Sequence, residues 1–139
     1  MTVAKALQAA YLKTVYRVLG AAEPVDIRIG RCSPGLDRLL SQNGVTQWAF
    51  LTAANPRSQP LPDAENAQRN ADMKRVLHEQ GWYTLDAVGL PDDGAWQPEQ
   101  SVLILGIDRE AALEVARRWQ QNAIVCGSIG QAAELAWVS

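Results

Sequence analysis

Hydrophobic residues recur with helical spacing in four segments of the chain. A capping side chain or a proline marks the start of three of these segments, and glycine follows the end of three, as is usual for helices. The predicted helices span residues 3–19, 34–42, 62–80 and 109–119.

Shorter apolar runs between these helices predict β-strands. Val25, Ile27 and Ile29 alternate with polar residues, which is typical of a strand with one face in water. Residues 48–51 and 102–105 are apolar without interruption, as expected for strands that are buried on both faces. Further strands are predicted at residues 82–88, 123–126 and 135–137.

The order of these elements predicts the fold class. From residue 46 to 127 the order is strand, helix, strand, strand, helix, strand, which is the split βαβ or ferredoxin-like pattern. We therefore expect an α+β fold in which helices cover a mixed or mainly antiparallel sheet, with an α-β-α extension at the N-terminus. The chain has 139 residues, of which 47% are hydrophobic and 20% charged, so residues 1–139 are expected to form a single domain around one core.

The predicted helix at residues 62–80 carries polar residues on the face that its apolar residues mark as core-facing. At about 100° per residue, Asn66, Arg69 and Asn70 fall in the same arc as Met73 and Leu77. A buried amide or guanidinium without a partner is costly. These side chains are therefore expected either to satisfy one another and the preceding loop, residues 54–61, or to bind a ligand.

Other polar residues lie at the ends of the predicted strands. Asn55 follows the buried strand 48–51, and Gln121 and Asn122 precede the strand 123–126. The space between a strand end and the first turn of the next helix is a common ligand position. The predicted ligand-binding residues are Asn55, Asn66, Arg69, Asn70, Gln121 and Asn122.

Two of the candidate residues carry charge. The planar fork of Arg69 suits a carboxylate or a phosphate. Glu99, just before the strand 102–105, can form a salt bridge with Arg69 or act as a general base, and it is the candidate catalytic residue. The sequence leaves open whether the ligand is only bound or is also converted.

The sequence offers little support for other site chemistry. His78 is the only histidine, and no cluster of His, Cys and carboxylates has zinc spacing, so we expect neither a metal nor an organic cofactor. The segment 127–130 is expected to form a hairpin turn and not a phosphate-binding loop. Cys32 and Cys126 are predicted to be reduced thiols of a cytoplasmic protein. The N-terminus does not resemble a signal peptide, and no apolar run could span a membrane.

Three classes of function fit these features. The first is the binding of a small polar or anionic, nucleotide-like molecule in a pocket built by residues 46–77. The second is a regulatory or protein-interaction module, which could form homo-oligomers, with Trp82 and Trp96 in an exposed patch and a purely structural polar cluster. The third is nucleic-acid binding on the sheet face, against which the net charge of −2 argues.

Several of these motifs together resemble those of a known family. The relevant residues are Leu51 to Pro56 with Ser58, then Asn66, Arg69 and Asn70, then Trp96, Glu99 and Ser101 before the strand 102–105, and finally Gln121 to Ile124. In this combination the chain resembles, over roughly residues 46–127, a small bacterial family known only as the domain of unknown function numbered 3293. The resemblance groups these motifs into one unit and implies no reaction.

Overall fold

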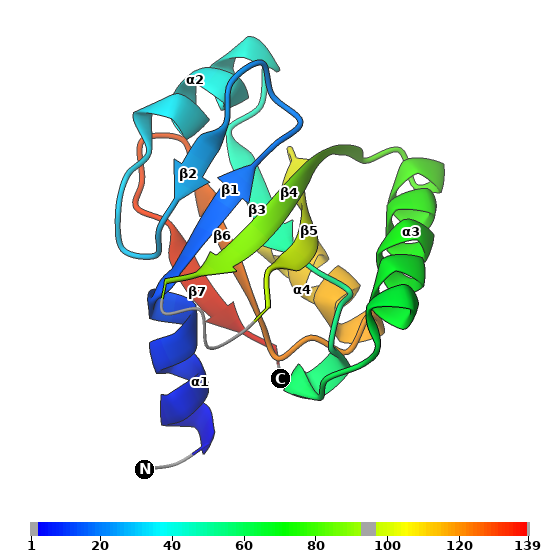
Figure 1. The fold of residues 1–139 in the computed structure, drawn as a ribbon. Coiled ribbons are helices and arrows are strands. Elements are labelled where there is room, and N and C mark those ends of the chain that lie inside the picture. The colour runs from blue at the N-terminus through cyan, green and yellow to red at the C-terminus, as the bar shows by residue number, and fades with distance from the viewer. Residues whose placement is uncertain (1–2, 93–96, 139) are drawn as a thin grey trace.

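The computed structural model describes residues 3–92 and 97–138. In these parts of the chain the helices are α1 (Val3–Leu12), α2 (Pro34–Gln42), α3 (Asp63–Glu79) and α4 (Arg109–Arg118), with one 3-10 turn, η1 (Pro56–Ser58). The strands are β1 (Thr14–Val18), β2 (Val25–Ile27), β3 (Gln47–Leu51), β4 (Tyr83–Pro91), β5 (Glu99–Leu105), β6 (Ala123–Ser128) and β7 (Glu134–Trp137). The predicted α+β class is confirmed (Figure 1).

All seven strands belong to one antiparallel sheet, in the order β2-β1-β4-β5-β3-β6-β7. The sheet curls until its two ends meet. Just after β2, Ile29 forms a parallel bridge with Ala133, which precedes β7. At this junction the Gly30 N–H donates to the Ala133 carbonyl at 2.8 Å, and the Ala133 N–H donates to the Arg31 carbonyl at 3.0 Å.

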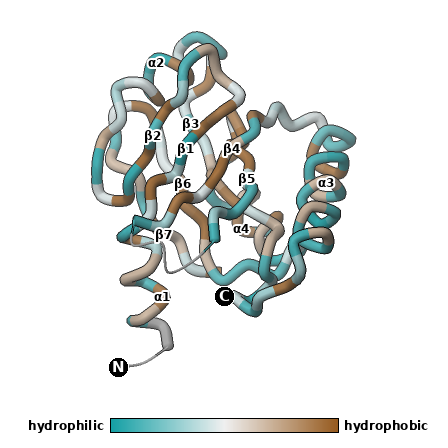
Figure 2. The backbone as a smooth tube through the Cα atoms, viewed as in Figure 1, coloured by the Kyte–Doolittle hydropathy of each residue, from teal (hydrophilic) through white to brown (hydrophobic). Residues whose placement is uncertain are grey.

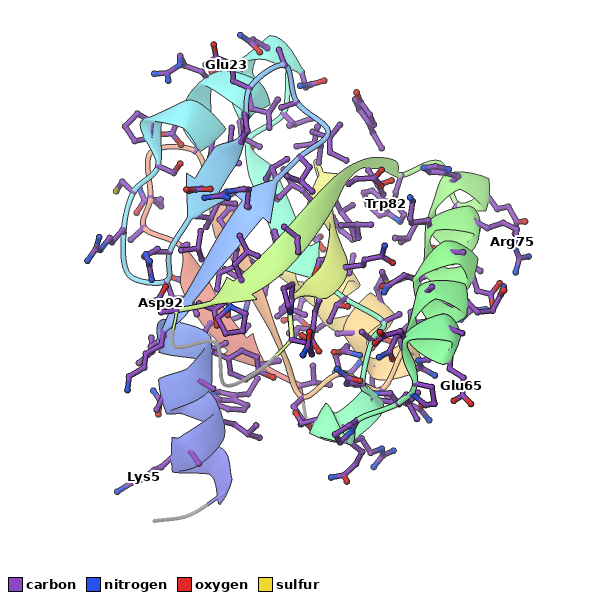
Figure 3. All side chains as sticks on the ribbon, viewed as in Figure 1. Lys5, Glu23, Glu65, Arg75, Trp82 and Asp92 are labelled. Atoms are coloured by element: carbon purple, nitrogen blue, oxygen red, sulfur yellow. The ribbon has the colours of Figure 1, made fainter. Side chains whose placement is uncertain are left out.

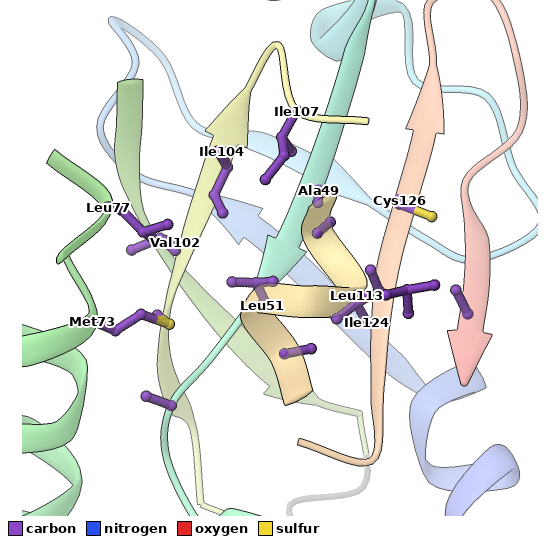
Figure 4. Close-up of a cluster of buried hydrophobic side chains, with 14 residues drawn as sticks. Ala49, Leu51, Met73, Leu77, Val102, Ile104, Ile107, Leu113, Ile124 and Cys126 are labelled. Atoms are coloured by element: carbon purple, nitrogen blue, oxygen red, sulfur yellow. The ribbon is translucent and has the colours of Figure 1, made fainter. Parts of the chain in front are cut away.

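Alternate residues of the central strands pack into two hydrophobic cores. On the outer face of the curl, Ala49 and Leu51 of β3 pack with residues of α3 and α4. Figure 4 shows Met73 and Leu77 pointing from α3 toward the sheet. On the inner face, residues such as Trp48 and Phe50 form the second core, which α2 closes at one end of the curl. Both faces of β3 are therefore buried, as its uninterrupted apolar run predicts.

The hydropathy pattern along the backbone follows this layering. In Figure 2 the strands contain most of the hydrophobic segments, whereas α3 is largely hydrophilic. The buried apolar residues of α3, Met73 and Leu77, belong to the outer core. Among the described helices, none combines the length and the apolar character that crossing a bilayer would require.

The predicted helix over residues 3–19 is wrong beyond its first part. The helix ends at Leu12, and Thr14–Val18 form β1, which pairs with both β2 and β4. Tyr16 and Val18 face the inner core. The β-branched and aromatic residues of this segment favour a strand once two partner strands are available. The N-terminal extension is therefore α-β-β-α instead of the expected α-β-α.

Candidate functional site

The loop between β3 and α3, residues 52–62, has an unusual backbone conformation. Asn55, Arg57 and Ser58 have φ values of 47°, 54° and 62°, in the left-handed region that non-glycine residues rarely adopt. Such a conformation persists when contacts from the rest of the protein hold it in place.

Asparagine side chains supply many of these contacts. The Asn66 amide oxygen accepts a hydrogen bond from the Asn55 backbone N–H at 2.8 Å, and its nitrogen donates to the Asn55 side-chain oxygen at 2.7 Å and to the Leu61 carbonyl at 3.2 Å. One turn further along α3, the buried Asn70 accepts from the Ala53 N–H at 2.9 Å. The inward polar stripe predicted for this helix thus exists, and it holds the loop.

Arg69 also bonds to the backbone. Its Nε donates to the Ala53 carbonyl at 2.6 Å and its Nη2 to the Trp119 carbonyl at 2.7 Å, and its guanidinium lies 5.8 Å from the centre of the Trp119 ring. The salt bridge to Glu99 that the sequence allowed is not formed, because the guanidinium donates to carbonyl oxygens instead. Arg69 therefore joins the loop to the end of α4.

The two polar residues before β6 complete the attachment of the loop. Gln121 Nε2 donates to the Ala54 carbonyl at 3.1 Å, and Asn122 Nδ2 donates to the Ser58 hydroxyl at 2.8 Å. In the described part of the chain, no buried side-chain nitrogen or oxygen lacks a hydrogen-bond partner. Much of the hydrogen bonding of this polar cluster is therefore within the protein, where it holds the loop in place.

A cavity of about 750 Å³ lies beside this network, at the end of the curl opposite α2. It is bounded by α1, by the inner face of the sheet and by the loop. The predicted site residues in its wall are Asn55, Asn66, Asn70, Glu99 and Gln121. Arg69 and Asn122 are not part of the wall. The aromatic residues in the wall are Tyr11, Tyr16 and Phe50.

Glu99 is the most perturbed carboxylate in the cavity wall. It lies at the start of β5, where its Oε2 accepts a hydrogen bond from Asn55 Nδ2 at 2.8 Å. Burial raises the pKa of Glu99, and the bond from Asn55 opposes this rise. The predicted salt bridge to Arg69 is replaced by this bond to a neutral amide.

Two tyrosines near Glu99 were not predicted as site residues. The Tyr16 hydroxyl donates to the Tyr11 carbonyl at 3.0 Å, and the side chain of Ser58 is close enough to the Tyr11 hydroxyl to lower its pKa. Burial raises the pKa of both tyrosines, and the charge of Glu99 raises it further. The assignment of residues 3–19 to one helix hid Tyr16. The alternation of Tyr16 and Val18 with polar Arg17 was the available signal.

The charged residues described in the cavity wall are all acidic. Its charged residues are Glu99 and Asp63, and no Lys, Arg or His is among the described residues that line it. No group of three or more His, Cys, Asp or Glu residues is placed to hold a metal ion in residues 3–92 and 97–138. The anionic ligand expected from Arg69 therefore finds no basic partner in this wall.

The two tryptophans that the sequence suggested for an exposed patch do not form one among the described residues. Trp82, labelled in Figure 3, is half-buried and packs against the outer core. Trp96 is outside the described residues. His78, near the end of α3, lies at the surface and bonds to the Thr84 hydroxyl at 3.0 Å.

Comparisons with known proteins identify a family without naming an activity. Curated proteins gave no match, and solved structures gave none. Residues 51–124 match the family described as protein of unknown function (DUF3293), and every predicted site residue from Asn55 to Asn122 lies inside the matched segment. Because the match spans 74 of the 139 residues, the chain belongs to this family of proteins of unknown function.

Proposed function

We propose that this protein binds a small organic molecule in the cavity between α1, the β3–α3 loop and the inner face of the sheet. One observation carries the proposal: a cavity of about 750 Å³ whose wall combines aromatic rings, amides and one half-buried carboxylate. Sites for small molecules are concave, mainly apolar and of roughly 300–1,000 Å³, with a few convergent polar groups.

The wall supports a neutral or basic ligand over an anionic one. An anion would meet Glu99 and Asp63 without a described basic side chain in the wall to offset them. The amides of Asn55, Asn66 and Gln121 can donate to or accept from a neutral polar group, although part of their capacity is used within the protein. We therefore propose a polar ligand that is neutral or basic, and not a nucleotide-like ligand, whose phosphates would be negatively charged.

Glu99 gives the cavity a group that can exchange protons with a ligand. Burial raises its pKa, which is the usual way in which a carboxyl group is prepared for general acid or base catalysis. The neighbouring hydroxyls of Tyr11 and Ser58 can donate hydrogen bonds to a reacting oxygen. These features support Glu99 as the catalytic residue if the bound molecule is also converted.

The other two classes of function draw less support. Large exposed hydrophobic side chains are Leu12, Leu19, Tyr83 and Trp137. They come from different elements, and Trp82 is turned toward the core. Nucleic-acid binding on the sheet would need an open face with basic residues, whereas both faces of β3 are buried.

We also infer that β3 to β6, with α3 and α4, form a split βαβ unit that carries the site. The strand order β4-β5-β3-β6 supports this, because β5 lies between β3 and β4, the two strands that α3 connects. The matched segment 51–124 covers most of this unit. The cavity then lies where this unit meets α1 and β1.

A cavity-filling substitution tests the proposal. Gly89 lies in the cavity wall, and a Cβ added there would meet its nearest neighbours, Thr14 Cγ2 and the Glu99 carbonyl, at 3.9 and 4.0 Å. Gly89→Leu should therefore obstruct the part of the cavity next to Thr14 and Glu99, while Gly89→Ala leaves that part open. A mixed library of neutral, basic and acidic fragments would be screened by two-dimensional NMR on the wild type and both variants.

We expect fragments to shift the amide signals of residues around the cavity, such as Tyr16 and Ser101. The same fragments should bind Gly89→Ala and lose binding to Gly89→Leu. A wild type that binds no fragment, or a folded Gly89→Leu that binds them equally well, would refute the cavity as a binding site.

A further inference from the structure

We propose that the ligand of this cavity carries a positively charged nitrogen, as a quaternary or protonated amine, held between Glu99 and the rings of Tyr11, Tyr16 and Phe50. The inference depends on the proposed function, because it assigns a chemical class to the molecule that the cavity binds. It adds a charge and a binding position that the cavity alone does not specify.

The first argument is the unbalanced charge of Glu99. It accepts a hydrogen bond from the neutral amide of Asn55, and no described cation contributes to the shift of its pKa. The second charged residue in the wall, Asp63, has the same sign. A half-buried carboxylate with no cationic partner among the described residues of the wall is less favourable than a paired one, unless it is protonated or a ligand supplies the missing charge.

The second argument is that Arg69 bonds to backbone carbonyls and not to Glu99. This guanidinium lies in the same network and donates to the carbonyls of Ala53 and Trp119. It therefore holds the loop, and the described residues that line the cavity offer Glu99 no basic partner. A cationic ligand would occupy the place that the sequence suggested for Arg69.

The third argument is the aromatic content of the wall. The faces of aromatic rings are negative, and quaternary ammonium groups bind where several such rings surround them. Tyr16 and Phe50 form an edge-to-face pair with ring centres 5.1 Å apart, and Tyr11 is held against Trp137 at 5.8 Å. The charge of Glu99 acts on both Tyr11 and Tyr16, so the carboxylate and these rings share one region of the cavity.

The surrounding groups also set the expected pH dependence. Tyr11 from α1 and Tyr16 from β1 are close enough to feel the charge of Glu99, Asn55 in the loop bonds to it, and Asp63 at the start of α3 is the other charged residue of the wall. Burial raises the pKa of both tyrosines, which therefore stay neutral where Glu99 titrates. A permanently charged ligand should bind more tightly as the pH rises and Glu99 loses its proton.

Three probes of one shape separate charge from size: choline, its neutral isostere 3,3-dimethylbutan-1-ol, and the anion 3,3-dimethylbutanoate. Dissociation constants would be measured by NMR titration of the full chain at pH 8. We expect choline to bind roughly tenfold more tightly than the alcohol. The carboxylate should bind most weakly.

Two variants test whether the preference for choline over the alcohol depends on Glu99. Glu99→Gln keeps an oxygen for Asn55 and removes the charge, so it should weaken choline roughly tenfold and leave the alcohol unchanged. Glu65→Gln, at an exposed position of α3 outside the wall, is the matched control and should leave choline binding unchanged.

The outcomes distinguish the two proposals. If neutral fragments bind and choline binds no better than the alcohol, the cationic ligand is refuted and the cavity remains a binding site. An equal loss of choline affinity in both variants would also refute the specific role of Glu99. If no probe and no fragment binds the folded wild type, both proposals are refuted.

Discussion

At the scale of single residues, Glu99 is a carboxylate placed where its charge is unfavourable. Asn55 gives it one hydrogen bond, and this bond only partly opposes the effect of burial on its pKa. Asn55 itself has a left-handed backbone and also contacts Asn66. Left-handed backbone and a carboxyl group with a raised pKa both occur more often at functional sites than elsewhere.

The raised pKa of Glu99 has a predictable effect on stability. The pKa of a glutamate in an unfolded chain is about 4.3. Because the folded value is higher, the folded protein binds more protons between the two values. The contribution of Glu99 to stability is therefore complete below about pH 4.3 and is lost as the pH rises through the folded pKa.

We expect Glu99→Gln to gain stability relative to the wild type as the pH rises through this window. Urea denaturation of both proteins between about pH 4 and pH 8 would measure the difference in the free energy of unfolding. Exposed groups such as Asp26, whose pKa Arg17 lowers, act equally in both proteins and cancel. A difference that stays constant or falls with rising pH would contradict the prediction.

At the scale of elements, the β3–α3 loop is held in place by the helix that follows it. Asn66 and Asn70 lie one turn apart on α3 and bond to backbone groups that no strand or helix satisfies. Local sequence was enough to predict this inward stripe, because helix periodicity and the start at Pro62 depend only on neighbouring residues. The partners of these side chains, 11 to 17 residues away, were expected only in general terms.

Asn70→Ala should therefore destabilise the protein by about 1–3 kcal/mol, because it leaves the buried Ala53 N–H without its acceptor. Gln68→Ala, at an exposed position of the same helix, is the control and should change stability by less than about 0.5 kcal/mol. Both would be measured by urea denaturation. Equal effects of the two substitutions would show that the loop does not depend on this contact.

The strand β1 shows where local sequence is insufficient. Apolar residues from Val3 to Val18 fit a helical repeat, yet the segment from Thr14 onward pairs with β2 and β4. Those partners are separated from it along the chain, so their effect could not be read from nearby residues. The same error removed Tyr16 from the predicted site, which is why the aromatic side of the cavity was missed.

At the scale of the whole molecule, the two ends of the curl differ. One end is closed by α2, and the other holds the cavity, which α1 lines on one side. Figure 1 shows that α1 extends away from the sheet, whereas β3 and β5 lie near its centre. The class of the fold followed from the order of the elements, but the curl and the cavity depend on contacts between distant segments.

Hydrogen exchange should reflect this arrangement. The amides of β3 and β5 are paired on both sides in the sheet and should exchange slowest, with protection that approaches the global stability. The amides of α1 should exchange faster than those of α3, whose Met73 and Leu77 are in the core. Protection of α1 equal to that of β3 would show that this helix is an integral part of the core.

The junction of Ile29 with Ala133 has a consequence for self-association. The outermost strands of an open sheet expose unpaired backbone groups that recruit other chains and seed fibrils. Here β2 and β7 are short, and the segments next to them bond to each other, so these strands offer only a brief template to a neighbouring copy. The curl that shapes the cavity thus also limits intermolecular strand pairing.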